Sequence, residues 1–88
     1  MQRKRKKSSL PSPPWTPFRV EIDKVGGHMS VLVSGTRAIV EFSHTRAVLK
    51  TVEYRVEISG KGLCVGVYEG GSVEVIGGVE SVGFFAEN

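Results

Sequence analysis

Apolar and polar residues alternate along short segments of this chain from about residue 18 onward, and glycines separate the segments. Tyr54 to Ile58 shows the alternation most clearly, because apolar residues at every second position enclose Arg55 and Glu57. A period of two places apolar side chains on one face of an extended strand. No segment carries the 3.6-residue apolar stripe of an amphipathic helix. The pattern therefore predicts an all-β domain.

Seven or eight short strands are expected, with a turn every 8–12 residues, which is typical of a sandwich or a small barrel. A sandwich is the preferred prediction. The recurring Val-x-Val/Ile-x-Gly unit ends at Gly35, Gly60 and Gly77, where glycine would supply the positive φ of a turn. The expected strands are 18–23, 29–33, 38–42, 46–51, 54–58, 63–67, 73–75 and 79–84.

The alternation also predicts which apolar side chains face away from the core. Ala38, Val40 and Phe42 are expected to point inward on the third strand. Ile39, Val48 and Ile76 fall in the outer phase of their strands and are candidate interaction residues. They would form a partner patch or pack a second layer, and the pattern does not separate these two roles.

A composition change near residue 17 divides the chain. Residues 1–17 are predicted to be a disordered, basic, Pro-rich tail, and residues 18–88 a single β-sandwich domain, because prolines disfavour helix and central strand. The tail holds Arg3, Lys4, Arg5, Lys6 and Lys7 and no acidic residue. The remaining residues hold 12 − 5 = 7 basic against 9 acidic residues, so the net charge of +3 becomes −2 for the domain.

The cationic run is a candidate electrostatic tail with three interpretations. It is a solvated segment that aids solubility, an attraction to an anionic membrane surface, or a non-specific contact with nucleic acid. The acidic domain argues against a nucleic-acid platform, which needs basic residues interleaved with exposed aromatics. Nucleic acid is therefore not an expected partner of the domain itself.

Trp15 is the only tryptophan and lies between prolines. It is interpreted as a hydrophobic latch on the domain edge, because Phe18 and the first strand follow at once. The alternative is a partner anchor, since Trp is favoured at interface hot spots.

Residues that could carry chemistry are few and scattered. His28, His44 and Cys64 lack the spacing of a metal site, and Cys64 lies in a Val-rich strand that favours an inert thiol. Gly60-Lys61-Gly62 is interpreted as a hairpin turn, because a phosphate loop needs a longer motif and a following helix. The acidic residues fall on separate strands, which disfavours paired acid–base catalysis. We therefore predict a protein that is not an enzyme and has no cofactor, metal or catalytic residue.

The single cysteine also indicates a reducing compartment. A secretory signal is not expected, because the basic amino-terminal run leads into a Ser- and Pro-rich stretch rather than an apolar segment. No stretch approaches the ~20 apolar residues of a membrane span.

Four segments together resemble the YabP/YqfC family of sporulation proteins from endospore-forming bacteria. Val31 to Ser43 is similar to that family's long apolar block with a central turn and an Arg. Ala47 to Thr51 matches its alternating segment ending in Thr, and Ile58 to Leu63 matches its Ile-x-Gly-Lys-x-Leu motif. Val73 to Phe84 matches its closing Val-x-Val-x-Gly block. The ordered set is more specific than any one segment, and it covers about residues 20–84.

The chain departs from the family pattern at a few turn positions and in its long basic tail. Ser34 and Gly35 replace the usual Glu-Asn, Ala38 replaces a Gly, and Tyr54 stands where a Gly is common. These differences concern local turn geometry.

The resemblance implies a small immunoglobulin-like β-sandwich and a non-enzymatic role in spore assembly. It places the protein in the cytoplasm of the mother cell, in cortex, coat or forespore envelope formation, acting through contacts with other sporulation proteins, some of them membrane-bound. Homo-oligomerisation and peripheral contact with the forespore surface stay open. The alternative from another class is a small β-fold binder of nucleic acid or anionic membrane that uses its cationic tail.

Overall fold

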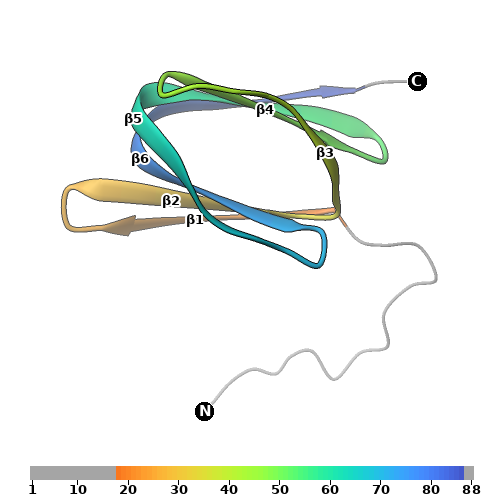
Figure 1. Ribbon diagram of the computed structural model, residues 1–88, viewed down its shortest axis with the longest axis horizontal. Helices are drawn as coiled ribbons and strands as arrows, with labels where there is room; N and C mark the ends of the chain where they lie inside the picture. The colour runs from red at the N-terminus through yellow and green to blue at the C-terminus, as the bar shows by residue number, and fades with distance from the viewer. Residues whose placement is uncertain (1–17, 87–88) are drawn as a thin grey trace, which may run out of the picture.

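The computed structural model of the chain describes residues 18–86, and these form an antiparallel sheet without helices (Figure 1). The predicted all-β class is therefore confirmed. The predicted tail, with Trp15 and the cationic run 3–7, lies outside the described residues. In sheet order the strands are β1 (Arg19–Val25), β2 (His28–Ser34), β6 (Ser72–Ala86), β5 (Tyr54–Glu69), β4 (Arg46–Thr51) and β3 (Thr36–Phe42).

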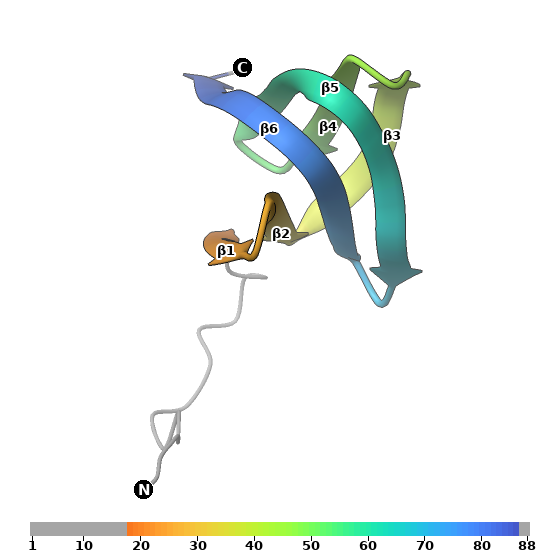
Figure 2. The same ribbon diagram turned by 90° about the vertical axis from the view of Figure 1, so that its left-hand side faces the viewer.

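Two long strands fold the sheet over on itself. The first part of β6 pairs with β2, and the first part of β5 pairs with β4, while β5 and β6 pair with each other along almost their whole length. β5 and β6 therefore pass from one half of the sheet into the other (Figures 1 and 2). One half contains β1 and β2, the other contains β3 and β4, and the halves face each other across the core.

Glycines make this bend possible, because the two backbones approach too closely for side chains. A Cβ at Gly60 would overlap the carbonyl of Gly78 and the Cα of Val79. Gly77 has a φ of 150°, and a Cβ there would lie 2.6 Å from the carbonyl oxygen of Gly62. The ladder between β5 and β6 also shifts register in this region, and such bulges bend and twist strands.

The bend explains why six strands form where seven or eight are expected. The segment 60–62, predicted as a turn, is a bend inside the continuous strand β5, which joins two predicted strands. Gly77-Gly78 likewise lies inside β6. The predicted turns at 25–28, 43–45 and 69–71 are confirmed.

The core lies between the two halves of the sheet. Phe18, Val20, Ile39, Val79 and Val82 pack against it while staying partly exposed. Burial of each large aliphatic side chain contributes about 1.5–3 kcal/mol. The fully enclosed apolar residues come from β2, β4, β5 and β6: Val31, Val33, Ala47, Leu49, Val56, Ile58, Leu63, Val73 and Val75.

A single glycine turns β2 into β3. Gly35 has a φ of 83°, which a residue with a side chain adopts only with strain. The Thr36 hydroxyl, which is buried, donates a hydrogen bond to the Val33 carbonyl (3.1 Å), and the Thr36 amide donates to the Gly71 carbonyl (2.8 Å). The predicted turn over 34–37 is thus compressed to one residue, and β3 starts in the opposite half of the sheet from β2.

Gly60→Ala is expected to lower the free energy of unfolding by about 3 kcal/mol, because the added methyl group meets backbone atoms that cannot move aside. Urea denaturation measures the loss. Gly27→Ala is the matched control, since a Cβ at Gly27 has no atom within 4 Å, and it should stay within about 0.5 kcal/mol of the wild type. Equal stability of the two variants would contradict the close crossing of β5 and β6.

Candidate functional site

Exposed apolar side chains gather on β3 and on the second part of β5. We call Val40, Phe42, Val65, Val67 and Tyr68 the β3–β5 rim. All five are at least 36% exposed, and Val40 and Tyr68 reach 60% and 61%. This is an unusual density of exposed large apolar groups for two short segments of a small domain.

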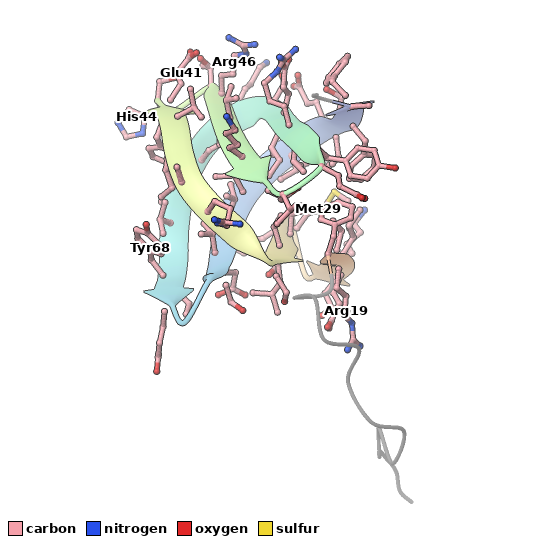
Figure 3. The ribbon with its side chains drawn as sticks, turned by 90° about the vertical axis from the view of Figure 1, so that its right-hand side faces the viewer. Arg19, Met29, Glu41, His44, Arg46 and Tyr68 are labelled. Carbon is pink, nitrogen blue, oxygen red and sulfur yellow. The ribbon has the colours of Figure 1, made fainter. Side chains whose placement is uncertain are left out.

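Two backbone hydrogen bonds connect the ends of β3 to the second part of β5 and to the turn that follows it. Near its beginning, β3 is tied to the β5–β6 turn by the Thr36–Gly71 bond. Beyond its end, the Leu63 amide donates to the His44 carbonyl at 2.8 Å. Between these ties, residues 18–86 contain no ladder that joins β3 to β5. Figure 3 shows His44 and Tyr68 on this side of the molecule.

The missing ladder explains why residues of the core-facing phase are exposed here. Tyr68 lies opposite the buried Val73, and Val65 lies opposite the buried Val75. Both side chains therefore share the face of the sheet that bears the core. They remain in contact with solvent because no further strand among the described residues covers this edge of β5.

Strand β3 reverses part of the expected pattern. Ile39, predicted to face outward, lies opposite the buried Leu49 and packs against the core. Val40 and Ala38 were also predicted to face inward, but Val40 is largely exposed and Ala38 lies opposite the exposed Lys50. Phe42 lies opposite the buried Ala47, on the predicted face, and is 39% exposed. The ladder between β3 and β4 shifts register twice, between Thr36 and Ala38 and between Ile39 and Glu41, and each extra residue reverses the phase of the residues after it.

Val48 is buried, so the exposure expected for it is wrong. It points away from the core, as predicted, but only 3% of its surface is accessible. It lies opposite Glu41 on one side and Glu57 on the other. Arg46, two residues earlier on the same face, spans both carboxylates, with Nη1 3.1 Å from Glu41 and Nη2 3.0 Å from Glu57. Long charged side chains cover apolar surface in this way.

The three apolar candidates from the sequence do not come together. Ile39 faces the core, and Val48 lies on the outer face of β4. Ile76 is half-buried on the outer face of β6 in the other half of the sheet, opposite Ser30. A Cβ at Gly66 would collide with the Ile76 side chain, so Ile76 packs over a bulge in β5. Sequence alternation did not predict the β3–β5 rim. The exposure of its side chains depends on bulges in β3 and β5 and on an unpaired strand edge, and the alternation of apolar and polar residues reveals neither.

The charged cover over Val48 continues along β5. Arg55 Nε lies 2.7 Å from Glu57 Oε2, and the Arg55 guanidinium sits 5.2 Å from the centre of the Phe85 ring. Hydrogen bonding from Arg46, with a smaller contribution from Arg55, lowers the pKa of Glu57 below its ordinary value of 4.5. The hydrogen bond to Glu57 is also the main cause that raises the pKa of Arg46. These shifts favour the ionised forms of Glu57 and Arg46 at neutral pH, and the cluster closes one face of the domain.

Chemically reactive side chains are dispersed in the part of the chain that the structure describes. No three His, Cys, Asp or Glu residues within 18–86 lie close enough together to hold a metal ion. Cys64 is a free, exposed thiol. The described residues form no helix that is long and apolar enough to cross a membrane.

Comparison with known proteins finds no family model, curated protein or solved structure that matches this chain.

Val48→Ala is expected to destabilise the domain by about 1–2 kcal/mol, because the substitution removes buried methyl groups from beneath the charged cover. Chemical denaturation measures the difference. Val52→Ala is the matched control, since Val52 is 58% exposed in the neighbouring turn. Indistinguishable stabilities would show that Val48 is not covered.

Glu57→Gln is expected to make stability less dependent on acid. The folded state lowers the pKa of Glu57, so its ionised form stabilises the fold above about pH 4.5, and this contribution is lost as the pH falls through the lowered value. The variant should therefore be less stable than the wild type near pH 7, and the gap should close toward pH 3. Unfolding midpoints across this range test it.

Glu80→Gln provides the control for the pH series, because no ion pair of Glu80 occurs among residues 18–86. Its stability should follow the wild type across the range. A pH-independent gap for Glu57→Gln would contradict the ionic role of this carboxylate.

Proposed function

We propose that this protein is a non-enzymatic component of spore assembly that acts through protein–protein contacts of the β3–β5 rim. Five large, exposed apolar side chains on β3 and on the second part of β5 carry the proposal. Exposed apolar groups concentrated on one part of a domain mark protein–protein interaction sites. The partners would be other proteins of the developing spore, some of them membrane-bound.

The resemblance to the YabP/YqfC family supplies the biological setting. The segments that carry the resemblance coincide with the bends of the sheet. The Val31–Ser43 block spans the corner at Gly35, Ile58–Leu63 contains Gly60, and Val73–Phe84 contains Gly77. These motifs therefore include the residues that shape the sheet. The same resemblance makes the mother cell, at the forespore surface, the proposed location.

The finer fold assignment that accompanies this proposal is an immunoglobulin-like sandwich. Two facing halves of antiparallel strands support it. The structure differs from a simple sandwich in one respect. β5 and β6 run continuously through both halves, whereas a sandwich consists of two separate sheets packed face to face.

A complementation experiment tests the proposal in an endospore-forming host that lacks its own copy of this gene. The wild-type chain should restore heat-resistant spores. Val40→Thr combined with Tyr68→Thr should leave the yield about tenfold lower, because the rim loses its two most exposed apolar groups. Val52→Thr, which changes an equally exposed apolar residue outside the rim, should restore the wild-type yield.

Two outcomes would reject the proposal. The first is an unchanged spore yield after gene deletion. The second is full restoration by the double variant at equal protein level. Fluorescent fusions carried in the same strains should label the mother cell around the forespore, and labelling of the nucleoid would instead favour a nucleic-acid binder.

A further inference from the structure

Strand β1 offers the most regular free edge of the sheet. Its seven residues pair with β2 in one unbroken register, whereas β3 and β5 contain register shifts. Bulges protect edge strands from pairing with other chains, and β1 has none. No strand within residues 18–86 pairs with its other side.

Over residues 19–23 the side chains of β1 divide into an apolar and a charged row, and Lys24 continues the apolar row with a charged group. Val20 packs against the core from the inner face, and Ile22, on the same face, is 49% exposed. Arg19 and Glu21 lie on the outer face, with Nε and Oε2 3.0 Å apart. Their side chains are 63% and 43% exposed, so both can turn toward a neighbouring strand.

The order of these residues is self-complementary in one antiparallel register. If Val20 of one copy lies opposite Val20 of another, each Arg19 faces a Glu21 and each Ile22 faces a Phe18. Opposite charges and apolar pairs at directly opposed positions stabilise antiparallel strands. A two-fold axis through Val20 generates all of these pairs at once.

Neighbouring registers that keep the side chains of the inner face on one side each contain at least one pair of like charges, whereas the register centred on Val20 contains none. A shift by one residue in each copy places Glu21 opposite Glu21, although it also places each Arg19 opposite an Asp23. A further shift places Glu21 opposite Asp23 twice, and a shift in the other direction places Arg19 opposite Arg19. Like charges directly opposite destabilise the pairing.

We infer that β1 is a self-association edge on which a second copy of this chain pairs antiparallel, centred on Val20. The pairing continues the β1–β2 half of the sheet into the second copy and covers the exposed part of Ile22. This inference does not rest on the proposed function, because it uses the opposite edge of the sheet from the β3–β5 rim.

Charge reversal on the full chain tests the register by sedimentation equilibrium. The wild type should form a dimer. Arg19→Glu alone and Glu21→Arg alone should each weaken dimerisation about tenfold or more, because both charged pairs then become repulsive. The double variant Arg19→Glu/Glu21→Arg should recover it. A 1:1 mixture of the two single variants should form heterodimers, because the reversed positions then face opposite charge.

Circular dichroism of each variant shows that the monomers are folded. A wild type that stays monomeric at millimolar concentration would overturn the inference. Dimers that the single reversals leave unchanged, or a mixture that stays monomeric while the wild type dimerises, would overturn the register.

Cross-linking gives an independent measurement in a Cys64→Ser background. Val20→Cys should yield a disulfide-linked dimer, because directly opposed Cα atoms in antiparallel strands lie about 4.5–5.5 Å apart, within disulfide range. Lys24→Cys, on the same strand, should not, since its two copies would lie about 26 Å apart. Equal cross-linking of both variants would contradict pairing centred on Val20.

Discussion

The close crossing of the β5 and β6 backbones is the constraint on which the rest of the structure depends. Antiparallel strands of this length would otherwise form an open, twisted sheet with one face exposed to solvent. The absence of Cβ atoms at Gly60 and Gly77 lets both strands turn together, so the sheet covers its own apolar face. A chain of 88 residues thereby encloses a core without a second sheet or a helix among the residues that the structure describes.

Folding one sheet over on itself leaves strand edges without a pairing partner among the described residues. The two halves meet through β5 and β6 on one side and through the Gly35 corner on the other, and β3 is left with one unpaired edge beside β5. Two parts of the surface differ in how far their apolar side chains are covered. On β4, an ion-pair cluster spreads over Val48, whereas along the β3–β5 rim apolar groups such as Tyr68 stay in contact with water. One face of the domain is therefore covered by charged side chains, whereas the rim leaves apolar side chains in solvent.

Alternation predicted the class, the inner faces of β2, β4 and the first part of β5, and three of the hairpin turns, because these depend on local patterning alone. It could not distinguish a glycine that ends a strand from one that bends it. Gly60 looks like a turn residue in the sequence, yet its role is to admit the backbone of β6 at Gly78, far along the chain. The exposure of Val40 and the burial of Val48 were missed for a related reason. Bulges in β3 and the reach of Arg46 across two strands are tertiary effects.

The order of strands also bears on how the chain folds. Four of the five strand pairings join strands that are consecutive along the chain, and such pairings form with little loss of chain entropy. Only β2 with β6 is remote, with Ser34 and Ser72 separated by 38 residues. Closing that loop costs more entropy than any other pairing. We therefore expect the β3–β4–β5–β6 meander and the β1–β2 hairpin to form early, and the pairing of β2 with β6 to limit the rate of folding.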